Sequence, residues 1–431
     1  MNNCENIFAL SSGHGKAGVA VIRISGTNLV SLFERIINKT EHNARYTYYT
    51  NLKDDSGDLI DQCIAVYFES PRSFTGEDVI EIYSHGAPAV INKIFEFLRD
   101  HKCRMAERGE FSRRAFYNNK MDLTDADGLI ALLDAKTDKQ RQSALKSFIG
   151  HDSKIYNDWR NQMIEISAYA AAILDYSEDD LPKNIDIKIK DKTKILLNEL
   201  QDALKGYRGN RALRNGFNIV LVGETNVGKS SIFNKLVGSN RAIVSDIAGT
   251  TRDVVSQQLE IDGYLVNLSD TAGIRKSNDT IEKIGIERTY NEIKNADLII
   301  HVYNDTPTEI NDNEITVINK SDLLKNKKLK NVIYTSVKTG DGFNDLMKII
   351  IEKMNNLMGN SESRIAINER THELLLDAIN ELNNAITKSG DNYDIFAEHI
   401  RRGADAIGKI LGIITTTEIA DATFSRLCLG K

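Results

Sequence analysis

The chain has 431 residues, or roughly three domains at about 150 residues each, and its 41% hydrophobic and 27% charged residues are typical of a globular protein. Its four cysteines stand far apart and form no CxxC pair, which excludes a disulfide framework and a zinc ribbon. The formal net charge of −6 argues against non-specific coating of nucleic acid, although it leaves room for a local basic patch.

The N-terminal segment has neither the basic n-region nor the apolar h-region of a secretory signal. No stretch approaches the roughly 18 consecutive apolar residues that a transmembrane helix needs. We therefore expect a cytoplasmic protein without a membrane association.

Alternating elements predict an α/β domain over residues 1–118. Short runs rich in β-branched residues, such as Val19–Ile24 and Val79–Tyr83, alternate with amphipathic stretches such as Ala89–His101. Residues 119–213 are predicted to be helical, because Ala, Leu, Lys and Glu dominate there and turn signals are few.

A second α/β region, residues 214–360, interrupts the helical part of the chain. Its short apolar strands are separated by helical stretches, which is the pattern of a parallel sheet. Residues 361–431 are helical again, with a predicted buried face formed by Leu374, Leu375, Ala378, Ile379, Leu382 and Ile386. We predict an N-terminal α/β domain and a discontinuous helical domain into which a second α/β domain is inserted.

Residues Gly223–Ser230, GETNVGKS, match the P-loop pattern GxxxxGK[ST] directly after the predicted strand Phe217–Val222. The glycines of such a loop let backbone N–H groups surround phosphates at a helix N-terminus. Lys229 is expected to contact the β- and γ-phosphate oxygens, and Ser230 to bind Mg²⁺. The predicted phosphate cradle consists of Asn226, Val227, Gly228, Lys229, Ser230 and Ser231.

Three further motifs follow predicted strands, at the edge where open α/β sheets bind ligands. Asp270 opens the motif DTAG and places a carboxylate near the metal. Asp322 closes the motif NKSD, and its carboxylate can accept from the N1–H and 2-amino donors of guanine, a pair that adenine lacks. Together with SVK at 336–338 these motifs predict a Ras-like P-loop GTPase domain. The remaining nucleotide contacts expected from them are Thr271, Ala272, Gly273, Asn319, Lys320, Ser321, Ser336, Val337 and Lys338.

One connection in this domain is unusually short. Between the predicted strands that end at Tyr303 and start at Glu314 lie only residues 304–313, whereas a parallel crossover usually needs about a dozen residues or more. The segment NDTPTEINDN is also rich in turn formers. We predict that the crossover helix is missing or reduced to one turn. This would expose one edge of the sheet and lower the stability of the domain, while the nucleotide pocket stays intact.

The motif set resembles that of the translation-factor-related GTPases. Residues 249–253, GTTRD, resemble their switch I, which makes Thr251 a second Mg²⁺ ligand. After DTAG, Ras-like GTPases carry the glutamine that orients the attacking water. Ile274 stands there in this chain, so hydrolysis must use another residue and another positive charge.

Outside the GTPase motifs, the chain resembles the MnmE (TrmE) family of tRNA-modification GTPases. The matching runs in the N-terminal part include Gly18–Gly26, Ser73–Asp78 and Arg108–Phe116. The last residues, Phe424–Lys431, resemble the terminal CxGK of that family. Because the GTPase motifs lie between helical segments, the resemblance covers essentially the whole chain.

The resemblance implies a GTPase that works with the flavoprotein MnmG. Together they would add a (carboxymethyl)aminomethyl group to C5 of the wobble uridine, position 34, of certain tRNAs. The carbon would come from 5,10-methylene- or 5-formyl-tetrahydrofolate, and the partner would use FAD and NADH. The resemblance also implies a homodimer, a heterotetramer with MnmG, and a folate-binding and dimerisation role for residues 1–118.

The resemblance assigns folate binding to Arg23, Glu81, Lys120 and Lys431. Glu81 would pair with amino donors of the pterin, while the cationic residues would face its polar edges and carboxylates. Lys431 is remote in sequence, so it would reach the others only if the last helix packs against a folate domain, which we expect to be that of a partner subunit. Cys428 would then lie near the folate carbon, where packing and chemistry are both open.

The resemblance further implies hydrolysis activated by K⁺, which would occupy the place of an arginine finger. Its implied ligands are Asn226, Ser245, Ile247 and Thr250, and Glu282 would position the attacking water. The implied catalytic residues are thus Asn226, Lys229 and Glu282. Switch I would also contact the nucleotide through Ser245, Asp246, Ile247, Ala248, Gly249, Thr250 and Thr251.

Two other functions compete with this one. A regulatory GTPase switch in ribosome assembly would bind RNA without chemistry, but the sequence holds no KH-like unit with a GXXG loop. A stand-alone folate-dependent aminomethyl transferase would leave the GTPase vestigial, which the intact Lys229, Asp270 and Asp322 oppose. Two basic clusters, Lys205–Arg214 and Lys320–Lys330, either contact tRNA phosphates or form solvated faces.

Overall fold

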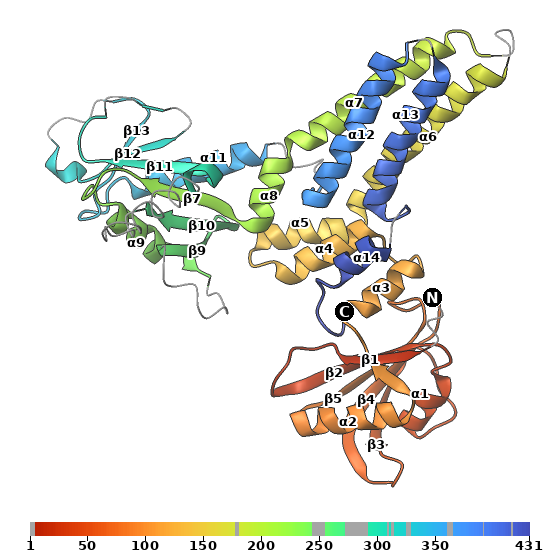
Figure 1. The fold of residues 1–431 in the computed structure, drawn as a ribbon. Helices are drawn as coiled ribbons and strands as arrows, with labels where there is room; N and C mark the ends of the chain where they lie inside the picture. The colour runs from red at the N-terminus through yellow and green to blue at the C-terminus, as the bar shows by residue number, and fades with distance from the viewer. Residues whose placement is uncertain are drawn as a thin grey trace, which may run out of the picture. The chain divides into compact units, whose positions relative to one another are not determined.

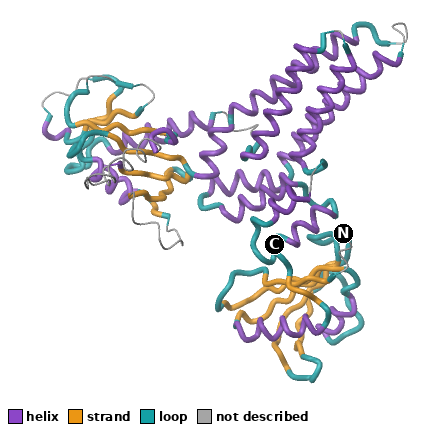
Figure 2. The backbone as a smooth tube through the Cα atoms, viewed as in Figure 1, coloured by secondary structure: helices purple, strands orange, loops and turns teal. Residues whose placement is uncertain are grey.

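The computed structural model describes residues 5–176, 181–243, 255–271, 292–307, 310–311, 314–324, 329–359, 365–390, 392–414 and 417–431. The chain divides into two compact units. The first comprises residues 1–130, 148–161 and 404–431, and the second comprises residues 131–147 and 162–403. The fold combines two α/β parts with long helices, as the sequence predicts, and Figure 2 distinguishes the strands of the two sheets from the helices.

The first unit contains a six-stranded sheet with the order β3-β4-β5-β2-β1-β6. Its strands are antiparallel to their neighbours, apart from the parallel pair β1 and β6. The strands are β1 (Asn6–Leu10), β2 (Ala17–Gly26), β3 (Thr47–Lys53), β4 (Leu59–Phe68), β5 (Asp78–Gly86) and β6 (Cys103–Met105).

Two helices, α1 (Val30–Ile37) and α2 (Pro88–Asp100), pack against this sheet (Figure 1). Side chains alternate along a strand, so Phe8 and Ile22 point into the core that these helices close. The alternate residues point to the opposite face, where Ile7 and Ala9 pack with Phe111. Arg23 and Glu81 lie on that second face, as neighbours in register on β2 and β5.

The other helical segments of the first unit form a small cluster around the C-terminal residues. Leu123, Ala126 and Leu129 form an apolar core with Phe424 and Leu427. The helices that contribute to the unit are α3 (Glu110–Tyr117), α4 (Leu123–Asp134), the start of α6 (His151–Asp175), the end of α13 (Tyr393–Leu411) and α14 (Thr417–Phe424).

In the second unit, long helices pack along one another, as α7 and α12 do (Figure 1). The apolar face predicted for α12 is confirmed at its centre, because Leu375, Ala378, Ile379 and Leu382 are buried, whereas Leu374 and Ile386 are only half-buried. Besides parts of α6 and α13, the helices are α5 (Asp138–Phe148), α7 (Ile185–Lys205), α8 (Tyr207–Asn215) and α12 (Glu369–Lys388).

The second unit also holds a seven-stranded sheet with the order β13-β12-β11-β7-β10-β9-β8. The five strands from β13 to β10 are parallel, and β9 and β8 extend the sheet antiparallel. Its core includes residues of α9 (Lys229–Ser239) and α11 (Phe343–Met358). The strands are β7 (Phe217–Val222), β8 (Arg241–Ala242), β9 (Val255–Ile261), β10 (Tyr264–Asp270), β11 (Leu298–Tyr303), β12 (Ile315–Ile318) and β13 (Val332–Tyr334).

The short connection between β11 and β12 has the predicted character. Its described residues, 304–307, 310–311 and 314, contain no helix, so the missing crossover helix is confirmed for that part of the connection. β11 and β12 nevertheless pair in parallel, with Ile300 opposite Ile315. Among the helices that the structure describes, none is both long and apolar enough to cross a membrane.

Candidate functional site: a P-loop and an N-terminal basic face

The P-loop connects the end of β7 to the start of α9 and approaches neighbouring strands closely. Gly223 has φ 142°, and a Cβ added there would lie 2.2 Å from the carbonyl oxygen of Val302. Gly228 has φ 98°, and its added Cβ would lie 2.2 Å from Nδ2 of Asn319. Only glycine fits at these two positions, because both the backbone angle and the space exclude a side chain.

Lys229 is buried at the first position of α9. Its Nζ donates to the carbonyl oxygens of Gly223, at 2.8 Å, and Glu224, at 2.7 Å. Burial lowers the pKa of Lys229, while the nearby Asp270 carboxylate acts in the opposite direction. The loop thus holds a desolvated ammonium group where the predicted phosphate cradle lies.

Ser230 and Asp270, which are far apart in the sequence, meet beside this loop. The Ser230 hydroxyl donates to Oδ2 of Asp270 at 2.6 Å, and the Asp270 side chain is buried at the end of β10. Thr271 anchors the same strand end by donating to the carbonyl oxygen of Leu221 at 2.8 Å. Hydroxyl and carboxylate oxygens are ligands that suit Mg²⁺, so these residues fit the predicted metal.

The NKSD motif follows β12 and is tied to the P-loop. Asn319 Nδ2 donates to the carbonyl oxygen of Val227 at 3.0 Å, and Lys320 Nζ donates to that of Asn226 at 3.0 Å. The Ser336 hydroxyl donates to Oδ1 of Asp322 at 2.7 Å, which orients the carboxylate expected to read guanine. The structure therefore assembles the phosphate and base motifs at one edge of the sheet.

Asn304 lies at this edge but was not predicted from the sequence. Its Nδ2 donates to the carbonyl oxygen of Asn226 at 3.5 Å, and its buried Oδ1 has no hydrogen-bond partner among the described residues. Its position directly after β11, at the carboxyl end of a parallel strand, is the signal that could have identified it.

Part of the predicted site lies outside the described residues. These positions are Ser245, Asp246, Ile247, Ala248, Gly249, Thr250, Thr251, Ala272, Gly273, Ile274 and Glu282.

In the first unit, Arg23 and Glu81 form an ion pair on the sheet face opposite α1 and α2. Arg23 Nη2 lies 2.8 Å from Oε1 of Glu81, and the Tyr83 hydroxyl donates to Oε2 of Glu81 at 2.6 Å. That hydrogen bond, together with burial, raises the pKa of Tyr83 to about 12. The Arg23 guanidinium also lies 5.3 Å from the centre of the Phe74 ring.

Lys431 reaches this pair within its own chain. Burial lowers its pKa, as does the nearby Arg23, whereas Glu81 and Cys428 act in the opposite direction. The expectation that a partner subunit's folate domain receives the tail is therefore wrong for this structure. The physical reason is that the core shared by α4 and α14 brings the end of the chain back to its own sheet.

The last residues are fixed to the first unit by specific contacts. The Ser11 hydroxyl donates to the carbonyl oxygen of Gly430 at 3.0 Å, and Arg108 Nε donates to that of Leu427 at 3.3 Å. Gly430 has φ 95°, and an added Cβ would lie 2.3 Å from the carbonyl oxygen of Leu10. The observed position of the C-terminal residues thus requires glycine at position 430.

Lys120 joins the same region through the loop at residues 73–78. A Cβ added to Gly76 would lie 3.1 Å from Cε of Lys120, and Phe74 of this loop is the ring beside Arg23. The structure therefore brings Arg23, Glu81 and Lys431 together and places Lys120 against the adjoining loop.

The cysteines of the first unit differ in exposure. Cys63 and Cys103 are buried, and burial raises the pKa of the Cys63 thiol to about 12 and that of Cys103 to about 11. Both thiols are therefore protonated and unreactive at neutral pH. Cys428 is exposed and lies close enough to Lys431 to influence its pKa.

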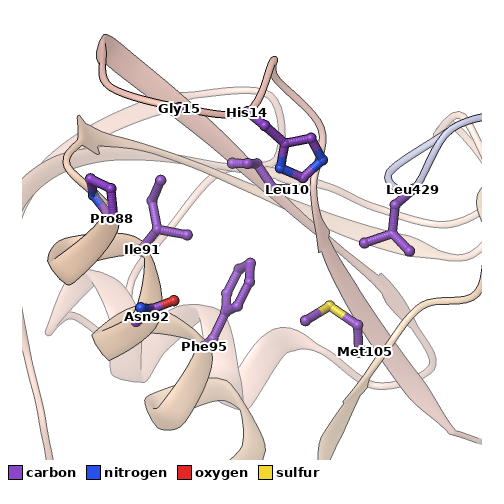
Figure 3. A pocket seen from close by; sticks show the side chains of 9 residues that line it. All are labelled: Leu10, His14, Gly15, Pro88, Ile91, Asn92, Phe95, Met105 and Leu429. Atoms are coloured by element: carbon purple, nitrogen blue, oxygen red, sulfur yellow. The ribbon is translucent and has the colours of Figure 1, made fainter.

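A cavity of about 270 Å³ lies at the end of β1 (Figure 3). Ile91 and Phe95 of α2 form one wall, and Leu429 of the tail forms another. The nine residues that line it include none of the four predicted folate residues.

The P-loop, the Ser230–Asp270 pair and the Asp322 carboxylate on a parallel sheet define a guanine-nucleotide-binding P-loop protein. Two family models match the chain: "MnmE helical domain" over residues 123–428 and "GTP-binding protein TrmE N-terminus" over residues 6–120. The chain belongs to the MnmE family of tRNA modification GTPases.

Curated relatives and solved structures resemble the chain over different shares of its length. The tRNA modification GTPases MnmE of Rickettsia canadensis (strain McKiel) and Rickettsia prowazekii (strain Madrid E) are each 38% identical over 447 residues, covering 99% of this chain and 100% of theirs. The G domain of the T. maritima FeoB iron transporter is 25% identical, with a TM-score of 0.24, and covers 32% of this chain and 99% of that one. As a family member with an intact P-loop, the chain is a GTPase.

Proposed function

We propose that the chain hydrolyses GTP while it modifies the wobble uridine of certain tRNAs with the flavoprotein MnmG. The product would carry a (carboxymethyl)aminomethyl group at C5 of uridine 34, built with a carbon from tetrahydrofolate. The observation that carries this proposal is that Ser11 and Arg108 hold the C-terminal tail on the N-terminal domain, where Arg23 and Glu81 act electrostatically on Lys431; the two ends of the sequence thus come together at the predicted folate residues.

The residues of this face fit a folate. When bound, 5,10-methylene- or 5-formyl-tetrahydrofolate would supply the one-carbon unit. Glu81 offers carboxylate oxygens to the amino donors of a pterin, and the ion pair with Arg23 orients that carboxylate. Lys120 and Lys431 supply cations for the carboxylates of the ligand. The lowered pKa of Lys431 makes its amine easier to deprotonate than an exposed lysine.

In the GTPase domain, each motif has a proposed task. Lys229 and the P-loop would bind the phosphates, Ser230 and Asp270 would hold Mg²⁺, and Asp322 would select guanine. Thr251 would complete the Mg²⁺ site. K⁺ would be bound by Asn226, Ser245, Ile247 and Thr250, and Glu282 would position the attacking water; of these only Asn226 lies in the described part of the chain.

The assembly that we propose is a homodimer through the N-terminal domain, and a cytoplasmic heterotetramer with MnmG. Exposed apolar side chains on the sheet face that carries Arg23 support the dimer. Tyr49 is 70% exposed and its cross-strand neighbour Ile64 is 41% exposed, which is costly for a free surface. The proposed domains are residues 1–118, 119–213 with 361–431, and 214–360.

The test is mass spectrometry of wobble uridine in tRNA from a strain that lacks this chain. The modified base should be absent, should return with the wild-type chain, and should not return with Arg23→Ala or Lys229→Ala. Unchanged modification in the deletion strain would instead favour a regulatory role, such as a switch in ribosome assembly.

A further inference from the structure

Five cationic side chains belong to α8 and to the start of α5, both in the second unit. Lys136 lies just before α5 and Lys139 in its first turn, while Arg208, Arg211 and Arg214 belong to α8. We call these five residues the α5–α8 basic patch. They are notable because the chain as a whole has a net charge of −6.

The arginines of α8 lie away from the buried side of the helix. Gly209, Ala212 and Leu213 are buried, whereas Arg208 and Arg211 are exposed and Arg214 is half-buried. Residues three apart lie on the same side of a helix, so the three arginines form a single ridge.

The buried side of α8 is closely packed. A Cβ added to Gly209 would lie 2.6 Å from the carbonyl oxygen of Leu357 in α11. The helix therefore has little freedom to rotate, and its ridge of arginines points away from the core.

One buried side chain joins the two helices of the patch. Gln140 is 7% exposed, and its Oε1 accepts from the backbone N–H of Lys136 at 2.9 Å. Its Nε2 donates to the carbonyl oxygens of Leu213, at 3.1 Å, and Arg214, at 2.9 Å. The backbones of Lys136 and Arg214 are thus held by the same side-chain amide, that of Gln140, although the two residues are far apart in the sequence.

The patch carries more positive charge than its partners neutralise. Arg208 and Arg211 share one buried carboxylate, that of Asp297, at 3.6 and 3.1 Å. Lys139 pairs with Asp262 at 2.9 Å.

The remaining two cations of the patch form no ion pair with a carboxylate of the described residues. Lys136 donates to the neutral side chain of Gln258 at 2.8 Å, and Arg214 has no acidic partner among the described residues. Among the described residues, the five cations thus form ion pairs with two carboxylates.

We propose that the α5–α8 basic patch binds the phosphodiester backbone of tRNA, an inference that rests on the proposed function. Guanidinium groups on a rigid helix can donate two hydrogen bonds each to phosphate oxygens, and the excess charge attracts a polyanion. The net charge of −6 makes such binding depend on one concentrated patch, since the rest of the surface repels RNA on average.

The test compares two full-length variants that lose the same charge. Lys136→Gln with Arg214→Gln removes two cations of the patch and spares those that hold Asp262 and Asp297. Lys183→Gln with Lys194→Gln is the control, because it removes two exposed cations, one just before α7 and one within it. Binding of labelled tRNA is measured at several KCl concentrations, alongside GTP hydrolysis.

The patch variant should bind tRNA about tenfold more weakly at low salt, because two phosphate contacts are lost. Its plot of log Kd against log salt should be shallower by roughly 1.5, given about 0.7–0.9 per contact. GTP hydrolysis should not change, and the control should bind tRNA like the wild type. Lys136→Arg with Arg214→Lys keeps both charges and should retain most of the affinity.

Equal affinity and slope in the patch variant and the control would overturn this inference, as would a wild-type chain that does not bind tRNA directly. A patch variant that binds tRNA normally but loses affinity for MnmG would show that the patch recognises an acidic protein instead. The proposed function is judged separately, by the wobble-uridine measurement.

Discussion

The meeting of the P-loop, DTAG and NKSD motifs at one edge of the sheet could be predicted, because each motif is local in sequence and follows a strand. Lys229, Ser230, Asp270 and Asp322 come together as their positions after strands indicate. Asn304 could not be found in this way, because no short pattern identifies a residue that contributes one amide to a neighbouring loop. Its role becomes visible only when the carboxyl ends of the strands are seen side by side.

The carboxyl group of Asp125 makes the stability of the protein depend on pH. Burial, and then the neighbouring Asp122, raises its pKa to about 6, compared with about 3.9 in an unfolded chain. The folded state therefore binds more protons between about pH 4 and pH 6, so stability is lost as the pH rises through this window.

We predict that Asp125→Asn removes this loss and makes the protein more stable at pH 7 than the wild type. The amide can still accept from the backbone N–H of Asp122 and can donate to the Ser153 hydroxyl, the two groups that now bind the carboxylate. Thermal unfolding of both proteins at pH 4.5 and pH 7 checks this, because other titrating groups cancel in the difference. An equal pH dependence in the two proteins would show that Asp125 does not titrate in this range.

A prediction about GTP hydrolysis follows from Ile274, which cannot orient water. Glu282→Ala should abolish most GTP turnover but leave GTP binding intact, because an interaction made mainly in the transition state affects rate more than affinity. Asn226→Ala should keep slow turnover and lose the response to K⁺.

Hydrolysis in KCl and NaCl at equal ionic strength checks both variants, since general screening is then the same. Equal wild-type rates in the two salts, or normal turnover by Glu282→Ala, would shift attention to Arg252 or Arg275 as an internal arginine finger.

Elements were predictable where a periodic or turn-rich pattern acts locally. The turn formers of residues 304–307 correctly indicate a connection without a helix, and the apolar spacing of α12 correctly identifies its buried centre. The sequence does not predict that the C-terminal tail contacts its own chain, because sequence spacing does not show which of two identical domains a remote segment contacts. The contacts of Ser11 and Arg108 with the tail settle this within one chain.

Gly430→Ala should impair folate binding without affecting the GTPase site. The substitution strains a residue at φ 95° and places a methyl group 2.3 Å from the carbonyl oxygen of Leu10, so the tail must leave its seat. Folate affinity should then fall to that of a chain lacking Leu429–Lys431, while GTP hydrolysis stays near the wild-type rate. Titration with 5-formyl-tetrahydrofolate measures the first effect. Wild-type folate affinity in both altered chains would mean that Lys431 is not a folate residue.

At the scale of the whole molecule, the N-terminal sheet leaves an apolar row uncovered beside its charged pair. Tyr49, Ile64 and Tyr83 are cross-strand neighbours on β3, β4 and β5, and Val21 continues the row on β2. Arg23 and Glu81 lie two residues further along their strands, on the same face. A dimer that covers the row would therefore also enclose the proposed folate residues.

The last prediction tests that arrangement. Ile64→Lys places a charge in the middle of the apolar row, where a partner would have to desolvate it, so the protein should become monomeric. Tyr46→Lys is the matched control, because Tyr46 is 64% exposed and packs beside Tyr48, whose ring contacts the core on the helix side of the sheet.

Sedimentation velocity at micromolar concentration distinguishes monomer from dimer. Folate affinity should fall together with dimerisation in Ile64→Lys, whereas nucleotide affinity should stay unchanged because the P-loop lies in the other compact unit. A dimer that survives Ile64→Lys would show that this face is not the interface, and the exposed row would then need another partner.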